Sequence, residues 1–247
     1  QSIRTADLFT IPIHGINSLG TIHGVKELIV PESTNLRHRS TVEYLWPFGL
    51  RSFSHIQTVS EGSKRDISDL LGYSIDDITS IHHGLNDRYK QESYQSGQLN
   101  EINIPQSYIL NLNSIRTKYK AIRKNVDTML KAYRQYLDTG GTLPLVLAGP
   151  GWKIPQISNK LDKLDLHENC YRPGFVSEEY LPTLYASASM YVCPSRYEGF
   201  GMSTLEAMAC GTPTIVSDVP QLKEVTGGFA YVYGEPENQN ALAEALS

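Results

Sequence analysis

The sequence predicts an α/β protein of two domains, each a parallel sheet covered by helices. Strand-like and helix-like segments alternate along most of the 247 residues, which is the pattern typical of such sheets. A polar stretch without usable periodicity, 88–105, separates two runs of this alternation and has the character of a linker. We therefore expect a first domain over 1–95, a linker over 96–106 and a doubly wound second domain over 107–247.

The first domain is expected to hold short strands and two helical stretches. Strands are predicted at 8–13, 20–24, 54–60 and 77–84. A helical stretch from about Leu36 to Phe53 should be interrupted by Pro47, because proline lacks the amide hydrogen that a helix interior needs. A second helix, 61–72, should end at Gly72. These elements amount to less than half of a typical α/β domain.

The second domain shows a cleaner alternation. Strands are predicted at 107–112, 143–149, 189–195 and 212–218, and helices at 125–137 and 152–164. In the helix 125–137 the residues at i, i+3, i+4, i+7 and i+11 are apolar, namely Val126, Met129, Leu130, Tyr133 and Leu137. This stripe is expected to face a sheet, and ligands of doubly wound sheets lie beyond the carboxyl ends of the strands.

Composition and chain ends limit the classes of protein. A formal net charge of -4 gives no reason to expect a nucleic-acid partner. The three cysteines lie in apolar segments without a C-x-x-C pair, so buried, reduced thiols of a cytosolic protein are expected. No apolar run approaches the roughly 18 residues that a membrane span needs. The chain reaches strand-like sequence almost at once and stops within the helical pattern NALAEALS, so a fragment truncated at both ends is expected.

The most informative segment is 194–218, PSRYEGFGMSTLEAMACGTPTIVSD, which predicts a strand, a glycine-bearing loop, a short helix and a further strand. Gly199 and Gly201 allow a sharp turn and close approach to a ligand, and Gly211 stops the helix. The unpaired amides at the helix start favour an anion such as a diphosphate.

Two carboxylates flank the glycines, and each has a structural alternative. Glu206 could close an S-x-x-E capping box with Ser203, and Glu198 could be a solvated loop acid. The string G-F-G by itself is weak, because it lacks the third glycine of a dinucleotide fingerprint.

Taken whole, the segment resembles the donor-site signature of the family-4 retaining glycosyltransferases of the GT-B fold, E-G-F-G followed by E-A-x-A-x-G-x-P. It is present as Glu198-Gly199-Phe200-Gly201 and then Glu206-Ala207-Met208-Ala209-Cys210-Gly211-Thr212-Pro213. The resemblance implies that Glu198 lies against the donor sugar and that Glu206 binds the ribose. It also implies that the backbone from Gly199 through Phe200, Gly201, Met202 and Ser203 to Thr204 meets the sugar and the diphosphate.

Other segments extend the resemblance over nearly the whole chain. Gly149 lies in a G-P-G turn after a strand, and backbone groups around Phe175 and Val176 would contact the base. GTIHGVKEL is similar to an I-H-D segment with His23 kept and the aspartate replaced by Gly24. QTVSEGSKRDI is similar to a V-S-x-x-S-K-x-D element, and HHGLND to an N-G-V-D turn. The fold implied is GT-B, with two Rossmann-like doubly wound domains, the first only partly present.

A departing nucleotide diphosphate needs its charge neutralised by a metal, by cations or by helix N-termini. No D-x-D pair and no ligand-spaced cluster occurs in the sequence, so we expect no metal and no cofactor. The cations are expected in the basic loop 114–125, where Lys124 matches the family lysine and Arg116 and Arg123 compete to be its partner. The loop is longer than usual, with Asn113 in place of a glycine. The alternative to phosphate binding is that these basic residues are simply exposed to solvent in a loop before a helix, and it applies to Lys118 and Lys120.

The histidines are interpreted in the same way. His23 resembles the family histidine near the transferred sugar, whereas a lone histidine after a strand is more often a hydrogen-bonded core residue. His82 and His83 are expected to be structural.

The function implied is a retaining hexosyltransferase of polysaccharide biosynthesis with Lys124, Glu198 and His23 as its catalytic residues. The donor would be a UDP- or GDP-sugar, and the form of the basic segment favours GDP-mannose. The acceptor would be a glycan or a lipid-linked intermediate. We expect a cytoplasmic location, which includes association with the inner face of the membrane. The alternatives are a nucleotide-sugar epimerase or phosphorylase of the same fold, a donor-binding module without turnover, and a dinucleotide oxidoreductase.

Overall fold

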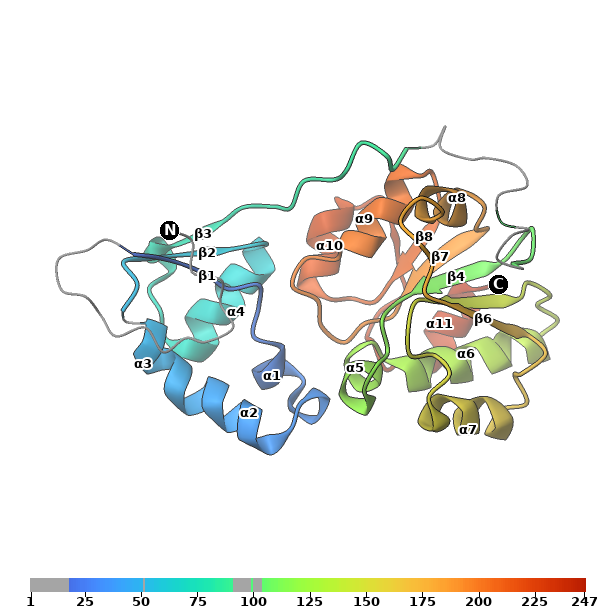
Figure 1. Cartoon of the computed structure of the whole chain (residues 1–247), viewed down its shortest axis with the longest axis horizontal. Helices are drawn as coiled ribbons and strands as arrows, with labels where there is room; N and C mark the ends of the chain where they lie inside the picture. Colours follow the sequence, from blue (N-terminus) through green and yellow to red (C-terminus); the bar gives the residue numbers. More distant parts are fainter. Residues whose placement is uncertain (1–17, 51, 91–98, 100–103) are drawn as a thin grey trace.

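The computed structural model describes residues 18–50, 52–90, 99 and 104–247, arranged as two lobes (Figure 1). The strand predicted at 8–13 lies outside the described residues. The first lobe contains a three-stranded sheet and the second a six-stranded sheet, and every pairing in both sheets is parallel. An α/β fold with parallel sheets is therefore confirmed.

The first sheet has the strand order β1-β2-β3. Its strands are β1 (Leu19–Thr21), β2 (His55–Thr58) and β3 (Ile78–Ser80). The helices of this lobe are α1 (Lys26–Ile29), η1 (Pro31–Ser33), α2 (Leu36–Ser40), η2 (Thr41–Leu45), α3 (Trp46–Leu50), α4 (Glu61–Leu71) and η3 (Ile75–Asp77). A small apolar core joins the sheet to α1, α3 and α4, with Ile56, Ile67 and Ile78 at most 1% exposed.

The predicted interruption of the first helical stretch at Pro47 is wrong. The helical path continues from α2 through the π-helical η2 into α3. Trp46 donates its backbone N–H to the Thr41 carbonyl, five residues earlier, and Pro47 then falls in the first turn of α3. A proline in a first turn removes no helical hydrogen bond, so the wider turn before it lets the chain continue.

The second sheet has the strand order β6-β5-β4-β7-β8-β9. Its strands are β4 (Ile109–Leu112), β5 (Leu145–Ala148), β6 (Cys170–Gly174), β7 (Met190–Cys193), β8 (Thr214–Val216) and β9 (Tyr231–Val232). Its helices are α5 (Lys118–Arg123), α6 (Val126–Asp138), α7 (Pro155–Lys163), α8 (Leu181–Ala186), α9 (Met202–Ala209), α10 (Pro220–Thr226) and α11 (Gln239–Ala245). The chain winds outward from β4 in one direction and then from β7 in the other. The point between β4 and β7 is therefore the switch point of a doubly wound sheet, where such folds bind ligands.

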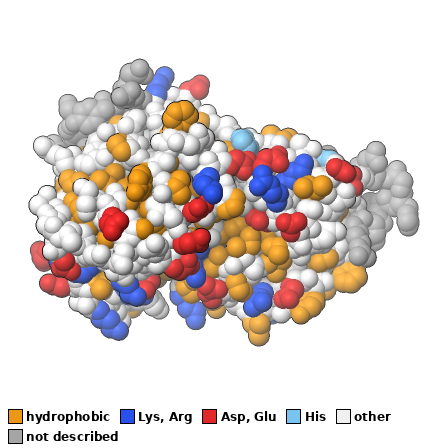
Figure 2. All heavy atoms as spheres, turned by 180° about the vertical axis from the view of Figure 1, so that it is seen from behind, with side chains coloured by type: hydrophobic (Ala, Val, Ile, Leu, Met, Phe, Trp, Pro, Cys, Tyr) orange, Lys and Arg blue, Asp and Glu red, His pale blue; other side chains and the backbone are white. Residues whose placement is uncertain are grey.

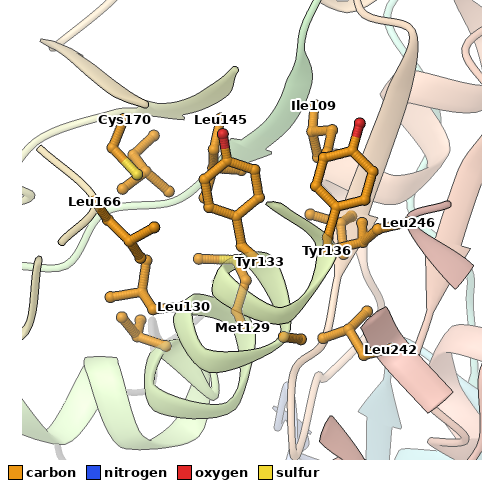
Figure 3. Packing of buried hydrophobic residues seen from close by; sticks show 14 of the residues in the cluster. Ile109, Met129, Leu130, Tyr133, Tyr136, Leu145, Leu166, Cys170, Leu242 and Leu246 are labelled. Carbon is orange, nitrogen blue, oxygen red and sulfur yellow. The ribbon is translucent and has the colours of Figure 1, made fainter. Parts of the chain in front are cut away.

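Helix α6 covers this sheet through the apolar stripe that its sequence predicts (Figure 3). Val126, Met129, Leu130 and Tyr133 are at most 1% exposed, and each such side chain contributes about 1.5–3 kcal/mol when it is buried. Leu137 is only partly buried, and Tyr136 packs into the cluster beside Tyr133. Packing with α11 on the same side completes this layer.

The three cysteines, Cys170, Cys193 and Cys210, are buried and unpaired, as the sequence predicts. On the face shown in Figure 2, the Lys and Arg side chains of the described residues are interspersed with Asp and Glu side chains. Among the described residues no helix is long and apolar enough to cross a membrane.

The turn after β5 depends on Gly149, which has a φ of 102° and packs directly on the backbone of Asn113 at the end of β4. A Cβ at this position would overlap the Asn113 carbonyl oxygen. Gly140 has a similar φ of 97°, but open space surrounds the position of its missing Cβ.

We expect Gly149→Ala to destabilise the fold by roughly 4 kcal/mol, because backbone strain and a clash with backbone add. The matched Gly140→Ala carries the strain alone and should lose about 1–2 kcal/mol. Urea unfolding of both variants measures the difference. Equal losses would show that the contact with Asn113 does not constrain Gly149.

Candidate functional site

A cavity of about 390 Å³ lies at the carboxyl ends of β4, β5 and β6. One of these strands, β4, flanks the switch point of the sheet. The segments that follow these three strands line it together with the end of α5. Its lining includes Asn113, Ser114, Lys120, Arg123, Lys124, Gly149, Phe175 and Val176.

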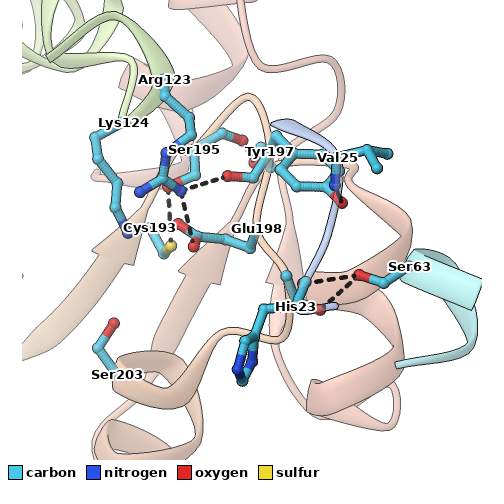
Figure 4. Close-up of polar contacts among 12 residues, drawn as sticks. His23, Val25, Ser63, Arg123, Lys124, Cys193, Ser195, Tyr197, Glu198 and Ser203 are labelled. Carbon is cyan, nitrogen blue, oxygen red and sulfur yellow. Dashed lines mark hydrogen bonds and ion pairs between the residues drawn. The ribbon is translucent and has the colours of Figure 1, made fainter. Parts of the chain in front are cut away.

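The strongest polar feature beside this cavity is a buried carboxylate between two cations (Figure 4). Glu198 accepts a hydrogen bond from Lys124 Nζ at 2.6 Å on one oxygen and from Arg123 Nη1 at 3.1 Å on the other. The three side chains are 11–16% exposed, so they are largely removed from water. Glu198 is therefore not a solvated loop acid, which was the alternative from the sequence.

Two opposing effects set the pKa of Glu198. Burial raises it, but the charges and hydrogen bonds of Lys124 and Arg123 outweigh the burial and hold the pKa at about 2. Glu198 is consequently ionised throughout the neutral and mildly acidic range, and the cluster carries one net positive charge.

The basic segment that supplies both cations is a helix rather than the long loop expected. Thr117 caps it by accepting a hydrogen bond from the Lys120 backbone N–H at 3.2 Å. Helix α5 ends at Arg123, and Asn125 then adopts a left-handed conformation with a φ of 55°. This sharp corner separates α5 from α6 and directs Arg123 and Lys124 toward Glu198.

Of the two arginines that competed to be the partner of Lys124, the structure brings Arg123 to the site. Arg123 also donates to the Tyr197 carbonyl oxygen at 2.9 Å. Arg116 is exposed and is not among the residues that line the cavity. Lys120 lines the cavity, and its pKa is lowered by burial and by the neighbouring cations, first Arg123 and then Arg116.

We call residues 195–201 the glycine loop; it runs from β7 to α9. Gly201, with a φ of 107°, is the N-cap residue of α9, so the helix begins at Met202. Ser203 is therefore inside the first turn and cannot close a capping box with Glu206. Its hydroxyl accepts from the Tyr191 hydroxyl at 2.9 Å, while Glu206 accepts from the Tyr185 hydroxyl at 2.8 Å.

The remaining predicted site residues lie around this centre. Burial raises the pKa of Glu206, partly offset by the Tyr185 hydrogen bond. Val176 is buried at the cavity, whereas the Phe175 side chain is 74% exposed, so an aromatic face is available at its rim. Thr204 is completely buried in the first turn of α9.

An aromatic cluster faces the glycine loop from the first lobe. The rings of His23 and His83 stack with centroids 5.6 Å apart, and Phe200 lies 5.4 Å from the His83 ring. Burial, followed by the neighbouring His23, lowers the pKa of His83, which favours the neutral form of its imidazole. The sequence analysis expected His83 to be structural, and the structure places its ring against that of His23.

Sequence reasoning also gave no role to Ser60 and Ser63, which hold the glycine loop by donating to the Gly199 carbonyl. It gave none to the two tyrosines that hold α9, Tyr185 and Tyr191, or to the loop residue Tyr197, which accepts from the Val25 backbone N–H. Within the described part of the chain, no group of three or more His, Cys, Asp and Glu side chains could hold a metal ion.

Comparisons with known proteins identify the family of the chain. The sequence profile of the glycosyl transferases group 1 matches residues 106–247, and the chain belongs to this family. An O-antigen chain mannosyltransferase B from Escherichia coli is 31% identical over 95% of this chain and 61% of its own length. The O-antigen chain mannosyltransferase RfbU from Salmonella typhimurium is 26% identical over 96% of this chain and 62% of its own length. The chain thus spans less than two thirds of these relatives.

Solved structures show the same fold at low sequence identity. Sucrose-phosphate synthase from Thermosynechococcus elongatus is similar with a TM-score of 0.72 and 23% identity, over 92% of this chain and 57% of that one. WaaG, a glycosyltransferase involved in lipopolysaccharide biosynthesis, is similar with a TM-score of 0.71 and 18% identity, over 93% of this chain and 64% of that one. The fold is GT-B, as the sequence resemblance implied.

The depressed pKa of Glu198 predicts how stability depends on pH. A carboxyl group with a folded pKa of about 2 and an ordinary value of 4.5 stabilises the fold fully above its ordinary value, and loses that contribution as the pH falls toward 2. We expect a loss of roughly 2 kcal/mol from this group between about pH 6 and about pH 3.

Glu198→Gln is the control, since its amide does not titrate. Urea unfolding across this pH range should give a shallower acid limb for the variant. Parallel curves for the two proteins would contradict the pairing of Glu198 with the two cations.

Proposed function

We propose that the chain forms the donor site and part of the acceptor side of a retaining, metal-independent glycosyltransferase that uses a nucleotide diphosphate-sugar. The observation that carries the proposal is the cluster of Glu198, Lys124 and Arg123 beside the start of α9, at the switch point of the second sheet. This arrangement offers positive charge for a diphosphate and a carboxylate for sugar hydroxyls in one place.

The chemistry follows from the charges. Breaking the bond between the sugar C1 and the diphosphate oxygen leaves a negative charge on the leaving group and an oxocarbenium-like sugar. Lys124, Arg123 and the first amides of α9 stabilise that leaving-group charge. The leaving oxygen then accepts the proton of the acceptor hydroxyl, whose oxygen bonds to C1 on the same face. In this scheme Glu198 offsets part of the positive charge of Lys124 and Arg123 and accepts hydrogen bonds from sugar hydroxyl groups. His23 faces the sugar from the first lobe.

The relatives support a narrower choice of donor and acceptor. Two of them are named O-antigen mannosyltransferases. The sequence Arg123-Lys124-Asn125 resembles the form of this segment in related enzymes with GDP-mannose-like donors, and so favours the same donor. We propose GDP-mannose as the donor and a growing glycan or lipid-linked glycan as the acceptor, in polysaccharide biosynthesis at the cytoplasmic face of the membrane.

The test is a thermal-shift panel with UDP-, GDP-, ADP- and dTDP-sugars, with NAD as the control for a dinucleotide oxidoreductase. A ligand at about 100 times its Kd stabilises by about 2.7 kcal/mol, which for a chain of this size raises Tm by roughly 5–10 °C. We expect the largest shift with GDP-mannose and none with NAD. A shift with NAD alone would overturn the proposed function, and a larger shift with a UDP-sugar would overturn the choice of donor.

Two substitutions separate the roles of the site residues. Lys124→Ala should lower kcat for sugar transfer by roughly 10²–10³, because it removes a charge that matters most when the leaving group departs. Glu206→Ala should instead raise the Kd of the nucleotide by about tenfold or more, the value of a hydrogen bond to a charged group.

Lys118→Ala on the exposed face of α5 is the matched control and should change neither quantity. Isothermal titration gives Kd and a radiolabelled-sugar transfer assay gives kcat. Unchanged values in both site variants would refute the assignment, and donor hydrolysis or isomerisation without transfer would favour the epimerase or phosphorylase alternative.

A further inference from the structure

The carbonyl group of Gly199, in the glycine loop, is held by two hydroxyl groups from the first lobe. Ser60 Oγ donates to it at 2.7 Å and Ser63 Oγ at 3.0 Å. Both serines are completely buried, at the N-terminus of α4. Ser60 is also the N-cap of this helix and accepts from the Ser63 backbone N–H at 3.0 Å, so both hydroxyls have a fixed geometry.

The opposite side of Gly199 is closed by the segment after β1. A Cβ at Gly199 would overlap the carbonyl oxygen of His23, and Ser63 Oγ lies 3.4 Å from the same oxygen. Gly199 is thus enclosed between α4 and the backbone of His23. The first lobe therefore restricts the position of Gly199 from both sides.

The residue before Glu198 is held in the same way. The Tyr197 hydroxyl accepts from the Val25 backbone N–H at 3.1 Å, and Tyr197 is 3% exposed. Gly24 makes this contact possible, because its φ is 147° and a Cβ there would overlap the Tyr197 hydroxyl. Gly24 is the position where this sequence departs from the I-H-D segment of the family.

A second contact holds the N-terminus of α4 against the second lobe. Glu224 on α10 accepts from the backbone N–H groups of Glu61 at 2.7 Å and Gly62 at 2.9 Å, and from His82 at 2.6 Å. A carboxylate at a helix N-terminus is stabilised by the helix dipole and the unpaired amides. Ser60 and Ser63 are therefore presented to Gly199 by a helix end that is itself anchored across the two lobes.

We propose that Ser60 and Ser63 are positioning residues for the reaction: they fix the backbone on one side of Glu198, so that the glycine loop is aligned only when α4 is packed against the second lobe. The inference rests on the proposed function. Glu198 is held by Arg123 and Lys124 through its side chain, while its neighbours Tyr197 and Gly199 are held by the first lobe. Packing of the lobes is thereby coupled to the alignment of the carboxylate and of the first turn of α9.

The decisive variants are Ser63→Ala and Ser60→Gly, studied in the protein at its full natural length. Ser63→Ala removes one donor to Gly199 and leaves the helix cap in place. Ser60→Gly removes the other, and glycine is still tolerated at an N-cap. Ser68→Ala, on the same helix, is the matched control.

Hydrogen exchange of peptides covering 195–205 reads the loop directly and does not depend on catalysis. We expect exchange at least about tenfold faster in Ser63→Ala and Ser60→Gly than in Ser68→Ala, at equal resistance to urea. Loop exchange equal to that of the control in both variants would overturn the inference.

Kinetics supply the second readout. For a positioning role, kcat should fall roughly 10–100-fold while the Kd of the nucleotide-sugar changes less than about threefold. Equal kcat in the variants and the control would also overturn the inference. If the wild-type protein binds no nucleotide-sugar, the proposed function fails, and the hydrogen-exchange comparison still decides whether Ser60 and Ser63 hold the loop.

Discussion

The arrangement of the second lobe depends on one buried ion cluster. Removing a carboxylate from water costs several kcal/mol, and only close pairing with cations offsets this cost. Glu198 meets that condition through Lys124 and Arg123, which come from the end of α5 while Glu198 follows β7. The cluster therefore joins the segments after β4 and β7, the two strands that flank the switch point. Loss of either cation would leave the charge of the buried Glu198 carboxylate only partly compensated, beside the cavity.

The same cluster explains how an acidic chain could provide the anion site that we propose. The net charge of the chain is -4, yet two cations and one carboxylate leave a local excess of positive charge beside the first turn of α9. In the low-dielectric surroundings of a buried cluster this excess has a larger effect than exposed charges at the same distance. The proposed preference for an anion therefore rests on the position of the charge rather than on the net charge of the chain.

The parts of the site that were predictable are those encoded locally. The start of α9 follows from Gly201, which has a positive φ, and the stripe on α6 follows from helical periodicity. The helix α5 was missed because the family pattern has a loop there, although Thr117 is a good N-cap and the sequence KYKAIR suits a helix. The capping-box alternative placed the helix start two residues too late, since Gly201 rather than Ser203 is the N-cap residue. The contacts of Ser60 and Ser63 with Gly199 were not predictable, because they depend on how two separate lobes pack.

The pair Gly24 and Tyr197 shows how a departure from a family pattern can be a consequence of packing. An aspartate at position 24 would place a Cβ and a carboxylate where the Tyr197 hydroxyl now lies, and a φ of 147° is unfavourable for any residue with a side chain. Glycine therefore permits a buried tyrosine to reach the Val25 N–H, and the tyrosine in turn fixes the backbone directly before Glu198. The two residues are 173 positions apart, so neither is informative alone. The geometry of Glu198 in this chain thus depends on a glycine that belongs to the other lobe.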